Sequence, residues 1–238
     1  MSKLTRWMDR NWYGAYPDRW DDLLLRSEIL KFVRPEDVVL DLGAGAGVVP
    51  EMNFLDKAGR VCGLDPDERV RENPFLHEAS VGSGEKLPYP PATFDLVFAD
   101  NVLEHLARPK AVFAEVARVL KPGGVFITKT PGRFHYVTLA TSLTGHGFHQ
   151  FVNRLRGRAA VDTFPTLYRA NSPGSIRRLA SGAGLSVVKC DMIEGRPEYL
   201  RLSAAAYVIG FVYERWVNRV PGFARFRVII LAVLKKGA

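Results

Sequence analysis

The chain has 238 residues, of which 47% are hydrophobic and 24% charged, and its formal net charge is +8. This composition is typical of a globular protein and excludes a disordered, collagen-like or coiled-coil chain. The apolar runs at residues 204–213 and 228–234 are short, because about 20 residues are needed to cross a bilayer. No apolar stretch follows the first charged residues, so the sequence predicts a soluble, cytoplasmic protein without a secretory signal.

The charge is unevenly distributed along the chain. Residues 1–130 carry 17 basic and 20 acidic side chains, whereas residues 131–238 carry 16 basic and five acidic ones. This asymmetry indicates that the second half meets an anionic partner, which can be nucleic acid, an acidic lipid surface or a phosphorylated or carboxylated small molecule. The alternative is that the surplus arginines only keep the surface soluble.

Apolar periodicity predicts helices and strands that alternate up to about residue 130. Helical spacing occurs at residues 4–12 and 20–33, and the second pattern ends before Pro35. Apolar runs of strand length then alternate with helical stretches, which is typical of βαβ units in a mainly parallel sheet. The expected strands are 38–42, 60–64, 75–81, 94–99 and 125–129, and the expected helices are 49–57 and 109–120.

This alternation is interrupted twice after Pro131. Residues 132–170 are aromatic and arginine-rich without clear periodicity. A helix is then expected from Ser172 and Pro173 to Gly182. After it we expect a strand at 185–191, an irregular or helical segment at 192–224 and a last strand at 226–234.

The strongest local motif follows the first expected strand. Asp41-Leu42-Gly43-Ala44-Gly45-Ala46-Gly47 places glycines at a strand-to-helix turn, where they permit positive φ and close approach of a ligand. Val48 stands where a dinucleotide fingerprint has its third glycine, and Asp41 suits an ammonium group better than a pyrophosphate. Asp65, about twenty residues on, can accept hydrogen bonds from ribose hydroxyls. The alternatives are a glycine turn without a ligand and a plain exposed acid.

Five motifs occur in order at compatible spacing: Val39-Leu40-Asp41-Leu42-Gly43-Ala44-Gly45-Ala46-Gly47, Gly63-Leu64-Asp65, Glu85-Lys86-Leu87-Pro88 with Phe94-Asp95-Leu96-Val97, Leu103-Glu104-His105, and Leu120-Lys121-Pro122-Gly123-Gly124. This ordered set resembles the class I S-adenosylmethionine-dependent methyltransferases, and more narrowly their type 11-like small-molecule branch. The resemblance covers residues 20–130 well and residues 170–186 more loosely.

The resemblance implies a three-layer, Rossmann-like α/β fold with a seven-stranded, mostly parallel sheet and an antiparallel last strand. We expect one methyltransferase domain over residues 1–238, with two late insertions as caps. Its expected parts are an N-terminal helical cap (1–34), the cofactor-binding core (35–131), a substrate cap insertion (132–170), a core helix and strand (171–191), a second insertion (192–224) and the last strand (225–238).

The resemblance also implies S-adenosyl-L-methionine as the cofactor and S-adenosyl-L-homocysteine as the product. Asp41 and Gly43 would lie near the amino and carboxylate groups of the methionine part, and Asp65 would bind the ribose. Ser83 stands where the family most often has an acid facing the adenine amine, so we expect weaker binding of adenine. The expected cofactor-binding residues are Asp41, Gly43, Ala44, Gly45, Gly47, Asp65, Pro66, Ser83, Gly84, Glu85 and Asn101.

Transfer of a methyl group from a sulfonium is an in-line displacement, so the protein must align a nucleophile and exclude water. An oxygen nucleophile also benefits from a base near neutral pH, which is usually a histidine. The candidate bases are His105, His135 and His149, with His146 beside the last of them. Tyr136, Tyr168 and Arg169 are candidates for acceptor binding, the arginine because a guanidinium pairs with carboxylate or phosphate.

No metal site is expected. His146-Gly147-Phe148-His149 lacks a carboxylate or thiol partner nearby, and the two cysteines, Cys62 and Cys190, stand in separate apolar runs. Such isolated thiols indicate reduced cysteines rather than a disulfide framework.

The sequence thus predicts methylation of oxygen or nitrogen on a small-molecule acceptor, such as an anionic sugar, a lipid precursor or a secondary metabolite. A nucleic-acid methyltransferase is disfavoured, because Asp100-Asn101-Val102-Leu103 replaces the Pro-Pro-Tyr type of loop. A non-catalytic or regulatory member that binds the cofactor stays an alternative. Peripheral membrane contact through Trp7, Trp12, Trp20 and the 204–213 run is less favoured than packing of these side chains.

Overall fold

The structure is a computed structural model that describes residues 2–144 and 165–237. The chain forms two compact units. The first unit consists of residues 1–20, 131–166 and 192–229, and the second of residues 21–130, 167–191 and 230–238.

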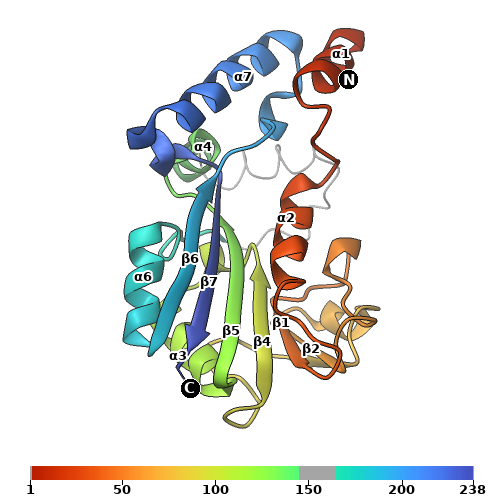
Figure 1. The fold of residues 1–238 in the computed structure, drawn as a ribbon, viewed down its shortest axis with the longest axis vertical. Helices are drawn as coiled ribbons and strands as arrows, with labels where there is room; N and C mark the ends of the chain where they lie inside the picture. The colour runs from red at the N-terminus through yellow and green to blue at the C-terminus, as the bar shows by residue number, and fades with distance from the viewer. Residues whose placement is uncertain (1, 145–164, 238) are drawn as a thin grey trace. The chain divides into compact units, whose positions relative to one another are not determined.

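Seven strands form one sheet in the order β3-β2-β1-β4-β5-β7-β6 (Figure 1). The pairs β1–β2, β1–β4, β2–β3 and β4–β5 are parallel, whereas β7 runs opposite to its neighbours (Figure 1). The predicted sheet with an antiparallel last strand is therefore confirmed. The strands are β1 (Val38–Leu42), β2 (Arg60–Asp65), β3 (Glu78–Val81), β4 (Phe94–Asp100), β5 (Leu120–Pro131), β6 (Leu185–Ile193) and β7 (Ile229–Lys236).

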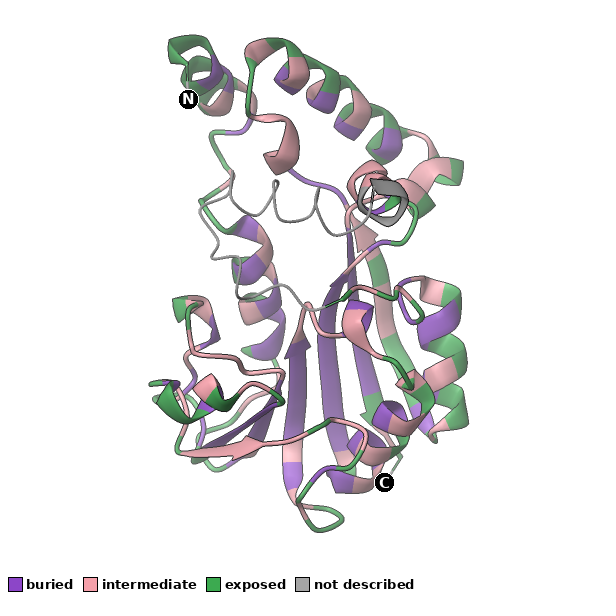
Figure 2. Cartoon of the chain, turned by 180° about the vertical axis from the view of Figure 1, so that it is seen from behind, coloured by how far each residue is buried: buried purple, intermediate pink, exposed green. Residues whose placement is uncertain are grey.

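The central strands are buried on both faces, which explains their continuous apolar runs. Val39 and Leu40 of β1 pair with Val61 and Cys62 of β2, and all four side chains are buried. Figure 2 shows this burial along the middle of the sheet, in contrast to exposed positions on the edge strand β6. Both faces of a parallel sheet are covered in this way when helices connect its strands.

Three helices flank the strands of the second unit. They are α2 (Trp20–Ile29), α3 (Pro109–Val119) and α6 (Pro173–Gly182). α6 begins as the sequence predicts, because Ser172 accepts a hydrogen bond from the amide of Ser175, whose side chain bonds back to Ser172 in a capping box. α2 ends at Ile29, earlier than its apolar pattern.

The predicted helix at residues 49–57 is wrong. Only a short 3₁₀ turn, η1 (Pro50–Met52), follows the glycine loop, and another, η2 (Glu68–Glu72), lies between β2 and β3. Val49 is held in an extended conformation, with φ −111° and ψ 96°, as is usual before proline. The carboxyl end of β1 therefore leads into a turn without an α-helical N-terminus.

Further boundaries differ from the prediction. β3 begins at Glu78 instead of at residue 75, and β7 covers residues 229–236 instead of 226–234. β5 begins at Leu120 instead of at residue 125, and β6 ends at Ile193 instead of at residue 191. The shift of β7 arises because residues 221–226 form the 3₁₀ helix η6 (Pro221–Phe226) before the strand starts.

The first unit is built around an aromatic cluster of two helices, α1 (Lys3–Trp12) and α7 (Ala204–Arg219). Met8, Tyr13 and Tyr207 form its buried centre. α4 (Tyr136–Thr144) and the short turn η5 (Glu198–Leu200) complete the described part of this unit. None of the helices among the described residues is long and apolar enough to cross a bilayer.

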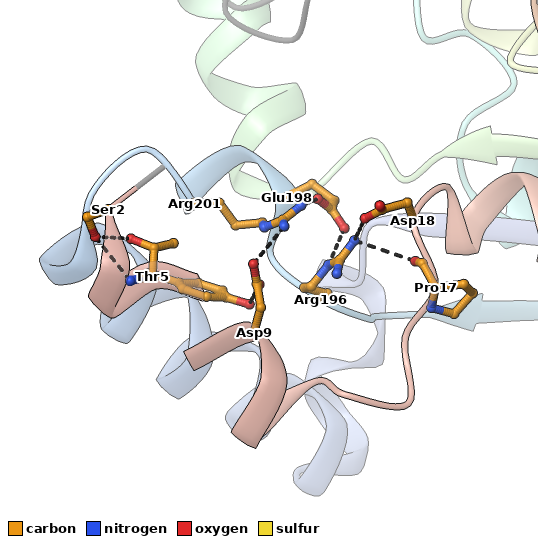
Figure 3. Close-up of polar contacts among 9 residues, drawn as sticks. Ser2, Thr5, Asp9, Pro17, Asp18, Arg196, Glu198 and Arg201 are labelled. Carbon is orange, nitrogen blue, oxygen red and sulfur yellow. Dashed lines mark hydrogen bonds and ion pairs between the residues drawn. The ribbon is translucent and has the colours of Figure 1, made fainter. Parts of the chain in front are cut away.

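Ion pairs tie the N-terminal segment to residues 196–207 (Figure 3). Arg201 donates to Asp9 at 2.7 Å and to Glu198 at 2.6 Å, and the hydroxyl of Tyr207 also donates to Asp9. Arg196 joins Glu198 to Asp18. These contacts connect parts of the first unit that lie almost 200 residues apart in the sequence.

Candidate functional site

Three glycines after β1 hold a backbone conformation that other residues rarely adopt. Gly43, Gly45 and Gly47 have φ values of 83°, 50° and 71°, all in the left-handed region. The amides of Gly43 and Ala44 donate to the carbonyl oxygen of Leu64 at 2.7 and 3.3 Å. The loop thus folds back over the carboxyl end of β2.

Two side chains hold this loop closely. A Cβ atom at Gly43 would lie 2.3 Å from Cγ2 of Val102, and one at Gly47 would lie 2.4 Å from Oδ1 of Asn73. Nδ2 of the buried Asn73 donates to the carbonyls of Ala44 and Gly45 at 2.9 and 3.3 Å. Sequence analysis missed Asn73, although its position before a proline signals a turn.

Asp65 ends β2 and faces the glycine loop. Its Oδ2 accepts a hydrogen bond from the amide of Gly45 at 3.0 Å, and its Oδ1 accepts one from the amide of Asp67 at 2.8 Å. Each carboxylate oxygen has a second lone pair, so both oxygens retain the capacity to accept a hydroxyl. Pro66, the next residue, is exposed.

Asp41 lies in β1 and is buried beside two further acids. Burial raises its pKa well above the usual value, and the charges of Asp100 and Asp65 raise it further. The carboxyl ends of β1, β2 and β4 therefore bring three carboxyl groups to the same edge of the sheet. Such a group of acids favours a cation and disfavours a phosphate.

A buried lysine compensates part of this acidity. Nζ of the fully buried Lys129 lies 2.6 Å from Asp22, 3.2 Å from Asp21 and 3.0 Å from Asp100. The three carboxylates match the three donors of an ammonium. Burial raises the pKa of Asp100 to about 6, although Lys129 opposes this shift. The sequence analysis did not single out Lys129 or the two acids of α2.

The remaining expected cofactor contacts lie in two loops of the second unit. Asn101 follows β4 with φ 53°, and its side chain donates to Asp100. The hydroxyl of Ser83 accepts a hydrogen bond from the amide of Glu85, whose carboxylate pairs with Arg108. Gly84 lies between them, where a Cβ would meet the side chain of Leu42 at 3.2 Å.

His105 lies on a segment of the second unit that adjoins the segment of Tyr168 and Arg169. His105 ends the 3₁₀ turn η3 (Leu103–His105), which begins just after Val102. The amide of Tyr168 donates to the carbonyl of Glu104, and Nη1 of Arg169 donates to the carbonyl of Ala107. Three of the predicted catalytic and acceptor-binding residues thus lie on adjoining segments.

Glu104, the middle residue of η3, is buried and belongs to a network of hydrogen bonds. Its buried carboxylate accepts a hydrogen bond from Thr130 at 2.9 Å, and Thr130 accepts one from Asn171. Burial raises the pKa of Glu104, and the neighbouring His105 opposes the shift. This network was not predicted, because its members are far apart in the sequence.

His135 and Tyr136 belong to the first unit and lie against each other and Tyr213. His135 is buried, its Nδ1 accepts from the amide of Val137, and its Nε2 lies 3.6 Å from Oε2 of Glu194. Burial lowers the pKa of His135 to about 3 and raises that of Glu194 to about 8. At neutral pH this imidazole is therefore uncharged and a weak base. Sequence analysis missed Glu194.

His146 and His149 lie outside the described residues. Among the residues that are described, no three His, Cys, Asp or Glu side chains are grouped as metal ligands.

Comparisons with known proteins agree with this geometry. Residues 40–128 match the family model described as a methyltransferase domain. A Mycolicibacterium smegmatis protein named as a probable S-adenosylmethionine-dependent methyltransferase is 38% identical over 102 residues, covering 41% of this chain and 39% of that protein. The ubiquinone biosynthesis O-methyltransferase of Idiomarina loihiensis is 33% identical over 106 residues, covering 40% of this chain and 42% of the relative.

Solved structures share the fold at low sequence identity. Geranyl diphosphate C-methyltransferase from Streptomyces coelicolor, in complex with S-adenosyl-L-homocysteine, has a TM-score of 0.56 and 13% identity over 91% of this chain and 78% of its own. The [4+2]-cyclase SpnF has a TM-score of 0.59 and 16% identity over 91% and 82% of the two chains.

The comparisons support a class I S-adenosylmethionine-dependent methyltransferase, with the family match confined to residues 40–128. The family model covers the glycine loop, Asp65, η3 and most of the parallel strands. The chain spans about two fifths of the length of the curated relatives named above. Because the fold also serves a cyclase, fold membership by itself does not establish the reaction.

We predict that Lys129→Met destabilises the protein by roughly 3–5 kcal/mol at pH 7, because removal of the ammonium leaves buried carboxylates without a counter-charge. The loss should shrink at pH 5, where Asp100, with a pKa of about 6, is protonated. Urea denaturation measures both values. Lys121→Met is the matched control, because its ion pair with Asp95 is part-exposed and worth about 1 kcal/mol or less. Equal losses in the two variants would contradict the assigned role of Lys129.

We predict that the free energy of unfolding of the wild type falls as pH rises toward 8, and that Glu194→Gln does not show this fall. The pKa of Glu194 is about 8 in the folded protein, above its unfolded value, so its stabilising contribution is lost as pH rises toward 8. His135, with a lowered pKa, acts in the opposite direction and only below its unfolded value of about 6.5. Between pH 6.5 and 8 the wild type should lose about 2 kcal/mol relative to the variant. Parallel stability profiles of the two proteins would refute the raised pKa.

Proposed function

We propose that the chain transfers the methyl group of S-adenosyl-L-methionine to an oxygen or nitrogen atom of a small-molecule acceptor. The observation that carries this proposal is the arrangement of the glycine loop around Asp65. A carboxylate held by the amide of Gly45 lies beside a loop in which added Cβ atoms at Gly43 and Gly47 would clash. These clashes are with Val102 and Asn73, whereas a Cβ at Gly45 would meet nothing within 4 Å, so the loop leaves room for a ligand at Gly45.

The charge of this region supports S-adenosylmethionine over a nicotinamide dinucleotide. Asp41 would face the ammonium group of the donor, whereas its carboxylate would repel a pyrophosphate. A pyrophosphate site also uses the N-terminus of an α-helix, and the loop here leads into the three-residue turn η1. Asp65 would hold the ribose, and Asn101 would lie by the methionine part. When bound, the donor supplies an electrophilic methyl group and a neutral thioether leaving group.

The adenine would lie by Ser83, Gly84 and Glu85. The Ser83 hydroxyl accepts from the amide of Glu85, and Arg108 neutralises the Glu85 carboxylate. Neither group offers a free carboxylate toward the adenine amine, which supports the proposal that adenine is bound more weakly here than in relatives with an acid.

We assign the general base to His105. It is half-exposed on the turn after Val102, the residue that packs against Gly43. Glu104 would act as a positioning residue, because its carboxylate is fixed by Thr130 and interacts electrostatically with His105. The base would accept the proton of an acceptor hydroxyl while the oxygen attacks the methyl carbon and the donor sulfur leaves as a thioether.

Tyr168 and Arg169 lie on the adjoining segment, so we place the acceptor beside them. Arg169 is exposed and would bind an anionic group of the acceptor. Relatives named for ubiquinone and menaquinone biosynthesis make a hydroxylated ring one class to test. A member that binds the cofactor without methyl transfer is the alternative.

Calorimetric titration tests the cofactor site. We expect S-adenosylhomocysteine to bind the wild type and Asp65→Asn to weaken it about tenfold or more, because a hydrogen bond to a charged acceptor contributes about 1.5–3 kcal/mol. Asp67→Asn is the control, because that carboxylate pairs with Arg69. NAD should give no binding heat. Absence of binding by both the donor and its demethylated product would refute the proposed function.

Rates with labelled donor test the base. His105→Gln should lower kcat roughly 100-fold or more on hydroxylated acceptors and leave affinity for S-adenosylhomocysteine unchanged. The acceptor panel should pair acidic with neutral phenols, quinols and sugars. A greater loss of kcat in His135→Gln or His149→Gln than in His105→Gln would move the base to another residue. Binding of the cofactor with no turnover of any acceptor would favour the non-catalytic alternative.

A further inference from the structure

The outward face of α7 is apolar. Four of its exposed side chains, at helical spacing, are aliphatic or aromatic, whereas an exposed helix face normally carries polar residues. Figure 2 shows exposed positions along one side of α7 and buried ones along the other. We call these residues the α7 stripe: Val208 (40% exposed), Ile209 (66%), Val212 (60%) and Trp216 (53%).

The opposite face of α7 is packed. Tyr207, Gly210, Glu214 and Val217 are buried. Glu214 is the single acid of this helix, and it accepts a hydrogen bond from the hydroxyl of Tyr13 at 3.1 Å. The α7 stripe therefore contains no acidic side chain and is not required to pack the interior of its own unit.

An aromatic contact extends the α7 stripe toward η6. Phe223 of η6 lies 4.5 Å from Trp216, measured between ring centroids. Leu4 and Trp7 of α1 are also exposed, whereas Trp12 and Phe211 pack against the buried cluster of Met8, Tyr13 and Tyr207. The exposed apolar surface of α1, α7 and η6 thus consists of side chains that soluble proteins normally bury or cover.

The charge around this surface is positive. Residues of the first unit carry 14 basic and six acidic side chains, whereas those of the second unit carry 19 of each, so the whole formal charge of +8 belongs to the first unit. Arg215 lies over the ring of Phe211 at 4.9 Å. The exposed cations on α1, α7 and η6 are Lys3, Arg6, Arg10, Arg215, Arg219 and Arg225.

We propose that α7, with α1 and η6, binds in the plane of an anionic lipid bilayer. A helix with branched aliphatic residues and tryptophan on one face and arginines along its edges matches the apolar and charged layers of such an interface. Arginine stems lie along apolar surface while their guanidinium groups reach phosphate. The positive charge of the first unit favours an anionic lipid surface, and not an uncharged apolar protein surface, as the partner. This inference is independent of the proposed methyl transfer.

Sedimentation with vesicles tests the proposal on the full chain. We expect binding to phosphatidylcholine vesicles containing about one quarter phosphatidylglycerol at low salt, where the Debye length is about 10 Å or more. Binding should weaken at least about tenfold on pure phosphatidylcholine or in about 1 M salt, because the exposed cations then lose their attraction to anionic headgroups.

Substitutions locate the contact. Ile209→Ser with Val212→Ser should weaken vesicle binding about tenfold or more, because each inserted aliphatic side chain contributes about 1.5 kcal/mol or more. Trp216→Phe should retain binding that Trp216→Ser loses. Val188→Ser is the matched control, because Val188 is similarly exposed at 57% but lies on β6 in the second unit. Arg219→Glu with Arg225→Glu should act like high salt, whereas Arg177→Glu with Arg178→Glu on α6 should have little effect.

Thermal unfolding of every variant shows whether it is folded, and a variant that is unfolded is replaced by Ile209→Thr alone. Lack of wild-type binding to anionic vesicles, or equal binding by the wild type and the Ile209/Val212 variant, would overturn the proposal. So would a concentration-dependent dimer that the same substitutions abolish, because it would show that a second copy covers the α7 stripe.

Discussion

The structure of the second unit depends on one buried ammonium group. Lys129 ends up at the carboxyl edge of the sheet, where it neutralises Asp100 of β4 and the two acids in the first turn of α2. Without it, the ends of three neighbouring strands would confine several carboxylates in a poorly hydrated region. With it, acidity remains concentrated at Asp41 and Asp65, beside the glycine loop. The same ion group therefore fixes α2 against the sheet and shapes the charge of the cofactor region.

This arrangement is consistent with a cationic ligand at a glycine loop that is not followed by the α-helix that the sequence predicted. A site for a phosphate needs the N-terminus of a helix, because its amides and dipole favour an anion. A cationic ligand receives its electrostatic stabilisation from carboxylates instead. Here hydrogen bonds with Asn73 and Asp65 hold the loop. The chain then continues through the short turn η1.

The sequence predicts features that depend on neighbouring residues. The strand at 38–42 and the cap at Ser172 were predicted at the residues where they occur, because apolar runs and capping are local signals. The helix predicted at 49–57 does not form, because Val49 before Pro50 is extended and only the turn η1 follows. Lys129 and Asn73 were missed for another reason: their partners lie 28 to 108 residues away, and only the folded chain brings them together.

The candidate histidines show how burial separates residues that a sequence cannot rank. His105 and His135 are equally plausible bases by composition, but one lies on a half-exposed turn and the other is enclosed with Tyr136 and Glu194. The free-energy cost of burying a histidine and a glutamate together is smallest when both side chains are uncharged. We therefore interpret this pair as part of the packing of the first unit. The chemistry of methyl transfer is then assigned to the neutral second unit, whereas the first unit combines positive charge with an apolar surface. An acceptor that partitions into lipid would fit both proposals, because a protein at a bilayer would lie beside the phase that contains its substrate.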